Sequence, residues 1–238
     1  MSETRNDFRT IEVTTDMLFD IWKTIPNAPK IALFAGPGHD GQKSVDSGDH
    51  DRKVEQIYRD YVSNPDRCDM YFQYEGKPLL LCYAATPTFY GADPAWKDDR
   101  FTIRWVTGYV GQQGDLYDRA TRNSHHFWSW EERGTQTYTV RNGMVECVSV
   151  TASSRAQGQE GGRGYIPARG RRNGDTFREQ FARARELGAG TVILISWNEW
   201  TNSEQLSVEI SKDLEPSVIH GTFYYDLLCE EIRKFKEQ

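Results

Sequence analysis

Stretches of consecutive apolar residues alternate along the chain with stretches in which apolar residues recur every three or four positions. Thr14 and Thr15 precede the first periodic stretch as helix caps and Pro26 follows it, which predicts an amphipathic helix over 14–25. Its apolar side chains share one helical face: Met17, Leu18, Ile21, Trp22 and Ile25. A continuous apolar run at 30–35 comes next, as expected for a strand that is buried on both faces.

The same alternation continues to the end of the chain. Three further periodic stretches predict helices: 54–61, 176–187 and 223–235. Four further apolar runs predict buried strands: 79–84, 101–106, 144–151 and 191–196. These runs do not show the strict apolar and polar alternation of strands with one solvent-exposed face. Helices and buried strands in this order predict an α/β fold with a parallel sheet.

An open doubly wound sheet and a barrel both have this architecture. No G-x-G-x-x-G follows any predicted strand, so the dinucleotide-binding open sheet loses its main support. Polar and aromatic residues gather just beyond the strands, where a (β/α) barrel has its shared mouth. We therefore predict a single (β/α)8 TIM-barrel-like domain over residues 1–238, with five of its eight strands recognisable. Either the other three are weak, or the chain is the C-terminal part of a longer barrel. A chain that lacks three strands would expose sheet edges, and must pair them by self-association or belong to a larger protein.

Composition adds one unusual feature, an excess of aromatic residues in a hydrophilic chain. The 238 residues include 7 Trp, 12 Tyr and 11 Phe, although the mean hydropathy is -0.72. The 35 acidic and 29 basic residues give a net charge of -6, which argues against nucleic acid as a partner. No apolar run approaches the roughly 18 residues that a membrane span requires.

The four cysteines are far apart and lack metal-ligand spacing, so we expect buried free thiols, with no metal and no cofactor. The N-terminus has no positively charged segment followed by an apolar one, so the sequence predicts no secretory signal. As given, it fits a cytoplasmic protein, or a secreted or periplasmic protein from which a leader is missing.

The most informative segment is Ser196-Trp197-Asn198-Glu199-Trp200, directly beyond the last predicted strand. Trp rings stack on the apolar faces of sugars, and amide and carboxylate groups bind sugar hydroxyls. Glu199 is therefore a candidate general acid, base or nucleophile, and Trp197, Asn198 and Trp200 are candidates for substrate binding. The alternative is that both Trp plug the barrel end and Glu199 bonds only backbone amides.

A second aromatic and acidic segment occupies residues 125–132. Trp128 and Trp130 point to the same side if the segment is extended, and the adjacent glutamates place titratable groups beside them. We interpret both Trp as candidate stacking surfaces and Glu131, or Glu132, as a candidate second catalytic carboxylate. The alternative is a polar loop that its Trp residues pin to the barrel rim.

Two charged residues lie in or beside predicted strands. Glu146 precedes an apolar strand and is a further candidate catalytic carboxylate. Arg104 lies inside the strand at 101–106, where a charge must be paired or face a polar cavity. It either contacts substrate or forms an internal salt bridge, for which Glu146 is a possible partner. Tyr83, at the end of a strand, and His39, in an acidic loop, complete the candidates for substrate binding.

Five segments together carry a family resemblance: 73–80, 170–177, 196–200, Asp213-Leu214-Glu215-Pro216 and Tyr224-Tyr225. Their order resembles the C-terminal part of glycoside hydrolase family 99-like and family 71-like proteins, which include the WbsX-type proteins of polysaccharide gene clusters. The resemblance spans about residues 28 to 235, and Glu199 matches the glutamate of the W-N-E-W motif. The H-x-E-P-Y segment of family 99 enzymes has no counterpart in this chain.

The resemblance implies a (β/α)8 barrel that cleaves glycosidic bonds of a poly- or oligosaccharide with carboxylates at its C-terminal rim. Such chemistry needs two acidic groups around the glycosidic bond. The alternatives are a non-catalytic glycan-binding protein or degenerate barrel remnant, and a protein associated with glycosyltransferases in polysaccharide biosynthesis.

Overall fold

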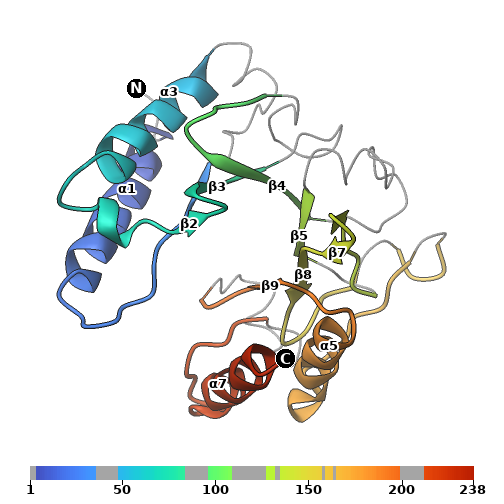
Figure 1. Ribbon diagram of the computed structural model, residues 1–238. Coiled ribbons are helices and arrows are strands. Elements are labelled where there is room, and N and C mark those ends of the chain that lie inside the picture. Colours follow the sequence, from blue (N-terminus) through green and yellow to red (C-terminus); the bar gives the residue numbers. More distant parts are fainter. Residues whose placement is uncertain are drawn as a thin grey trace. The chain divides into compact units, whose positions relative to one another are not determined.

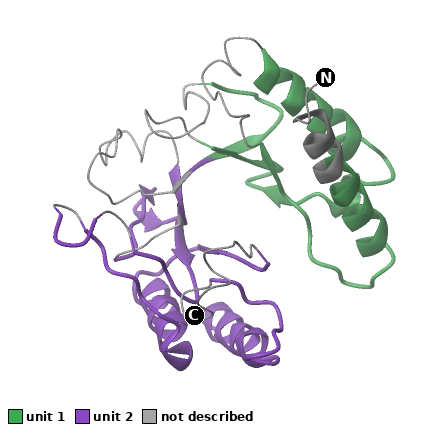
Figure 2. Cartoon of the chain, turned by 180° about the vertical axis from the view of Figure 1, so that it is seen from behind, with its two compact units in different colours: residues 1–104 green, residues 105–238 purple. Residues whose placement is uncertain are grey.

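In the computed structural model the chain folds into two units, Met1–Arg104 and Trp105–Gln238 (Figures 1 and 2). The structure describes residues 4–35, 48–83, 96–108, 127–131, 135–156, 159–162, 165–198 and 212–238, with the backbone alone for 4–11, 107–108 and 131. The boundary between the units lies inside strand β4 (Thr102–Gly108). No helix in the described part of the chain is long and apolar enough to cross a membrane.

The first unit combines helices with a small sheet. Its helical elements are α1 (Thr4–Trp22), α3 (Asp49–Ile57), the π-helical turn η1 (Tyr58–Val62) and the 3-10 turn η2 (Cys68–Met70). Strand β1 (Leu33–Ala35) pairs in parallel with β3 (Lys77–Tyr83). Strand β2 (Gln73–Tyr74) runs antiparallel to the start of β3 through the turn Glu75-Gly76, where both residues have the positive φ of a type I′ turn.

Helix α1 differs from its sequence prediction in two ways. It begins at Thr4, so Thr14 is an interior residue and not a cap, because β-branched residues are tolerated within a helix that tertiary packing supports. The ring of Phe19 is fully buried and packs on that of Tyr61, with 4.8 Å between centroids. Met17 and Ile21, expected on the buried face, are about half exposed.

The second unit contains two parallel strand pairs. In the first, Trp105 and Val106 of β4 lie opposite Phe127 and Trp128 of β5 (Phe127–Glu131). In the second, β8 (Cys147–Val150) pairs with β9 (Thr191–Leu194). The hydroxyls of Ser129 and Ser149 are hydrogen-bonded at 3.0 Å, so β5 and β8 lie side by side. A hairpin formed by β6 (Val140–Arg141) and β7 (Met144–Val145) precedes β8.

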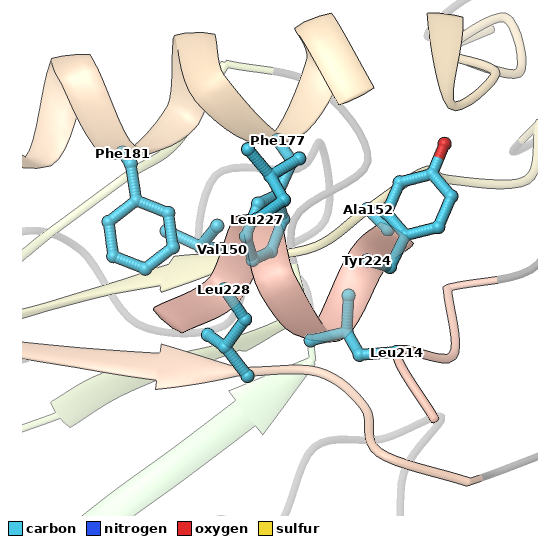
Figure 3. Close-up of a cluster of buried hydrophobic side chains, with 8 residues drawn as sticks. All are labelled: Val150, Ala152, Phe177, Phe181, Leu214, Tyr224, Leu227 and Leu228. Carbon is cyan, nitrogen blue, oxygen red and sulfur yellow. The ribbon is translucent and has the colours of Figure 1, made fainter. Parts of the chain in front are cut away.

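Two amphipathic helices cover one face of the β8–β9 pair. They are α5 (Asp175–Glu186), which follows the 3-10 turn η3 (Arg172–Gly174), and α7 (Phe223–Lys236). Side chains from these helices, from β8 and from neighbouring segments form one buried cluster (Figure 3): Val150, Ala152, Phe177, Phe181, Leu214, Tyr224, Leu227 and Leu228. Val148 packs on Ala184 of α5, so Val148 and Val150 face the helices and Ser149 faces away from them.

The prediction of a parallel α/β fold is confirmed, because strands β1, β3, β4, β5, β8 and β9 all take part in parallel pairs. The sequence predicted five of these strands and left residues 127–131 open between an extended segment and a polar loop. They form a strand, β5, because their Trp and Phe rings supply the apolar contacts of a core strand.

Two further expectations from the sequence were wrong in part. The strand expected at 144–151 is divided at Glu146, because residues 144–145 turn back to pair with β6 before the core strand β8 begins. The thiols of Cys82 and Cys147 are buried as expected, but that of Cys68 is half-buried and that of Cys229 is exposed. All four are free cysteines.

Candidate functional site

Two motif segments that are far apart in the sequence meet where β9 ends. Ser196 and Trp197 lie two and three residues beyond the last residue of this strand, Leu194. The backbone N–H of Leu214 donates to the carbonyls of Ser196 and Trp197, each at 3.1 Å, and that of Glu215 donates to Trp197 at 3.0 Å. These hydrogen bonds join segment 196–198 to segment 213–216 at the carboxyl end of the strand.

A buried polar network lies beneath this junction. The hydroxyl of Ser196 donates to Oδ1 of Asp213 at 2.6 Å, and Nη2 of Arg171 donates to the backbone carbonyl of Asp213 at 2.6 Å. The Arg171 guanidinium also lies over the ring of Tyr224, 4.2 Å from its centroid. Arg171 and Asp213 are each only 1% exposed. The network thus adds the motif segments 170–177 and Tyr224-Tyr225 to the junction.

Above the network, two aromatic rings are open to solvent. Trp197 and Tyr225 are each 45% exposed, and their rings lie edge to face with 6.0 Å between centroids. A side-chain hydrogen bond with Cys229 raises the pKa of Tyr225. Asn198 is also exposed. Exposed rings beside polar groups are the arrangement that binds sugars.

Several predicted site residues fall outside this description. Glu199, Trp200, His39 and Glu132 lie outside the described residues. Glu131 is the last residue of β5, opposite Gly108 of β4, and is described by its backbone alone. Residue 131 is therefore at the carboxyl end of its strand, the end at which barrel enzymes build their active sites.

The two Trp residues of β5 differ in exposure. Their segment is a strand, so Trp128 and Trp130 share a face, opposite to that of Ser129. Trp130 is half-buried, but the indole of Trp128 is 2% exposed. Trp128 is thus part of the protein core in this structure and offers no open ring face to a ligand.

Glu146 lies at the other end of the β8–β9 pair from Ser196. It directly precedes β8, and the backbone N–H of Gly190, just before β9, donates to the carbonyl of Val145 at 3.0 Å. Its carboxylate is 3.5 Å from Nη1 of Arg141 and is almost fully buried. This position and pairing favour a structural ion pair over a catalytic role beside Ser196.

Arg104 is held inside the first unit. It is 2% exposed, its Nη2 donates to Oε2 of Glu75 at 2.9 Å, and its guanidinium lies 5.0 Å from the centroid of the Tyr74 ring. Of the two alternatives, the structure favours the internal salt bridge, with Glu75 and not Glu146 as the partner. Tyr83 ends β3 and is half-buried, packed edge to face on Phe34 at 5.7 Å.

A polar cleft of about 340 Å³ lies between α1 and residues 56–67. Two of its acidic side chains are engaged by neighbours: Asp16 accepts from the hydroxyl of Tyr61 at 3.0 Å and from Arg67, and Asp20 pairs with Lys23 at 2.9 Å. The contacts of Asp16 connect α1 to Tyr61 and Arg67, and we assign no sugar-binding role to this cleft. Within the described residues, no three His, Cys, Asp or Glu side chains are placed to hold a metal ion.

Comparison of the fold with solved structures finds glycoside hydrolases of family 99 (GH99). A GH99 endo-alpha-mannosidase from Bacteroides thetaiotaomicron is similar with a TM-score of 0.57 and 14% identity, over 89% of this chain and 68% of that one. A second structure of a GH99 endo-alpha-mannosidase from this genus, in complex with bis-tris-propane, matches with the same TM-score and identity over 89% and 71%. No family model and no curated protein matches the sequence.

The likeness shows the fold, which is that of a (β/α)8 TIM-barrel-like protein, as the sequence predicted. It covers most of this chain and about two thirds of the mannosidase. The similarity is therefore one of fold, shared with these GH99 structures.

Asp213, Arg171 and Ser196 are not among the site residues that the sequence predicts, although each lies in one of the motif segments. The sequence does show an arginine and an aspartate in two of the motif segments, and a serine at the end of a predicted buried strand. That pattern is weak by itself, because only the fold shows that the three segments meet.

Proposed function

We propose that this protein binds a poly- or oligosaccharide at the carboxyl end of β9 and cleaves its glycosidic bonds. The observation that carries the proposal is the exposed pair Trp197 and Tyr225, which stands where four motif segments converge. Glu199, two residues after Trp197, is the proposed catalytic carboxylate, and Glu131 at the end of β5 is its proposed partner. The GH99-like fold supports a carbohydrate as the ligand.

Binding is tested first, by thermal shift against a panel of oligosaccharides. A ligand that binds only the folded state raises Tm by mass action, whether or not it is cleaved. We expect the parent protein to be stabilised by at least one glycan and Trp197→Ala to lose that stabilisation. Met144→Ala removes another exposed apolar side chain, on the hairpin before β8, and is expected to respond as the parent does.

Catalysis is tested by turnover of the glycan that binds. General acid–base or nucleophilic groups contribute about 10²–10⁴-fold to rate, so Glu199→Gln is expected to lower kcat by at least about 100-fold while glycan binding remains. Unchanged turnover in Glu199→Gln removes Glu199 from the mechanism. A panel with no stabilising glycan overturns the proposal as a whole.

A non-catalytic glycan-binding protein is the second candidate, and the position of Glu146 favours it. Hydrolysis needs two carboxyl groups about 5–9.5 Å apart, and Glu146 is engaged with Arg141 at the far end of its strand. The second carboxylate must then come from residue 131 or 132. Thermal stabilisation by a glycan that the parent protein does not cleave would assign the protein to this second class.

A further inference from the structure

We propose that Asp213, held by Arg171, is a positioning residue that clamps segment 196–198 through the Ser196 hydroxyl and so fixes the orientation of Trp197. The inference rests on the proposed glycan-binding function and names residues that act on the same site without touching the ligand. It follows from the hydrogen bonds that fix the segment, from the burial of Asp213, and from the elements that Arg171 joins.

The clamp acts on segment 196–198 at both its side chain and its backbone. The Asp213 carboxylate accepts the Ser196 hydroxyl at 2.6 Å, and the next two backbone N–H groups, of Leu214 and Glu215, donate to the carbonyls of Ser196 and Trp197. One short stretch of chain therefore makes four hydrogen bonds to two consecutive residues. Such a set fixes both the position and the rotation of the backbone that carries the Trp197 ring.

Asp213 does not itself offer a group to a sugar, because it is 1% exposed. A carboxylate in this position acts through the residue it bonds, here Ser196. A hydrogen bond to a charged acceptor is stronger than one between neutral groups, so the ionised carboxylate holds the Ser196 hydroxyl more firmly than an amide would. Asp213 is for these reasons a positioning residue and not a catalytic one.

Arg171 holds the clamp in place from a third segment of chain. Its Nη2 donates to the Asp213 carbonyl at 2.6 Å while its guanidinium stacks on Tyr224 of α7. The side chain thus connects the residue before η3, the segment at 213–216 and the final helix. The planar guanidinium makes the stacking and the hydrogen bond together, which a lysine ammonium does not reproduce.

The test compares conservative variants at both ends of the clamp with a matched control. Ser196→Ala removes the hydroxyl and Asp213→Asn removes the charge. Ser149→Ala, the control, removes another hydroxyl of the same unit that is hydrogen-bonded to a side chain, in this case that of Ser129. Circular dichroism and Tm establish that each variant is folded. If Asp213→Asn does not fold, Ser196→Ala and Arg171→Lys carry the test.

Two readouts separate positioning from general destabilisation. Amide hydrogen exchange of Leu214 and Glu215 reports on the clamp directly, and we expect it to become about tenfold faster in Ser196→Ala and Asp213→Asn and to change less than about twofold in Ser149→Ala. Affinity for the stabilising oligosaccharide, measured by calorimetry, is expected to fall about tenfold in the first two variants alone. The double variant Ser196→Ala/Asp213→Asn is expected to lose no more glycan affinity than the single variant with the larger loss, because both substitutions weaken the same hydrogen bond.

The outcomes distinguish this inference from the proposed function. Parent-like exchange at Leu214 and Glu215 in both clamp variants overturns the clamp. Faster exchange with unchanged glycan affinity overturns its role in orienting Trp197 while the glycan-binding proposal stands. If the parent binds no oligosaccharide in the panel, the proposed function fails, and the exchange data alone decide whether the clamp fixes the backbone.

Discussion

At the scale of single residues, His50 shows how burial controls charge. Its imidazole is 2% exposed in α3, lies edge to face on the Trp96 ring at 4.5 Å, and has neither ring nitrogen hydrogen-bonded among the described residues. Burial lowers the pKa of His50, with Lys53 acting in the same direction and Asp51 opposing it. The folded protein therefore holds this residue in its neutral form.

This gives a pH dependence with a defined sign. The folded pKa of His50 lies below its unfolded value of about 6.5, so the unfolded chain binds the proton first. The contribution of neutral His50 to stability is present above pH 6.5 and is lost as pH falls below it. Urea unfolding between pH 8 and pH 5 is expected to show this decline.

The variant His50→Leu is expected to remove that part of the decline, because leucine has no proton to bind. His220→Leu is a suitable comparison, since it removes a histidine of the other unit. An identical slope of unfolding free energy against pH in His50→Leu and the parent would contradict the assignment.

At the scale of elements, two glycines with similar φ angles have different surroundings. Gly174, before α5, has φ +89°, and Gly143, in the β6–β7 turn, has φ +79°. A Cβ at Gly174 would lie 2.8 Å from Cδ2 of Leu227 and 3.3 Å from the Phe223 ring, whereas no atom lies within 4 Å of a Cβ at Gly143. The first glycine is required for packing as well as for backbone conformation.

The pair provides a matched test of that difference. Gly143→Ala is expected to cost about 1–2 kcal/mol of unfolding free energy through left-handed backbone strain alone. Gly174→Ala adds overpacking against Leu227, and the total is expected to be higher by about 1 kcal/mol or more. Chemical denaturation of the two variants and the parent measures both values. Equal losses would show that α7 moves aside freely.

The elements also show what the sequence could predict and why the rest was out of reach. Periodicity identified α5 and α7 to within about one residue, because both bury one face against a sheet. It placed the start of α1 too late in the chain. It also left out Phe19, which is buried but is not one of the residues of the predicted apolar face. The clamp of Ser196 by Asp213 depends on contacts between residues 17 positions apart, which no local pattern encodes.

At the scale of the whole molecule, the two units share one continuous strand. The boundary between Arg104 and Trp105 falls within β4, with no linker between the units. Domains that unfold independently are normally separated by exposed linkers. We therefore expect both units to unfold together, as the prediction of a single domain requires.

Calorimetry with one core variant in each unit tests this expectation. Leu80→Ala in β3 and Phe181→Ala in α5 truncate side chains that are 0% and 1% exposed, and they are expected to cost about 2–5 and 3–5 kcal/mol. Both are expected to lower the Tm of the same single transition. Two transitions, each shifted by only one of the variants, would show two independent domains.

The exposed thiol of Cys229 has a practical use. It lies one helical turn after Tyr225, whereas Cys82 and Cys147 are fully buried, and burial raises the pKa of the Cys82 thiol far above its ordinary value. A maleimide dye is therefore expected to label Cys229 before either buried cysteine. Because the dye would be attached beside the ring pair that includes Trp197, its emission is expected to change if a sugar binds there as proposed, so the chain already carries an attachment point for a fluorescent probe of the proposed site.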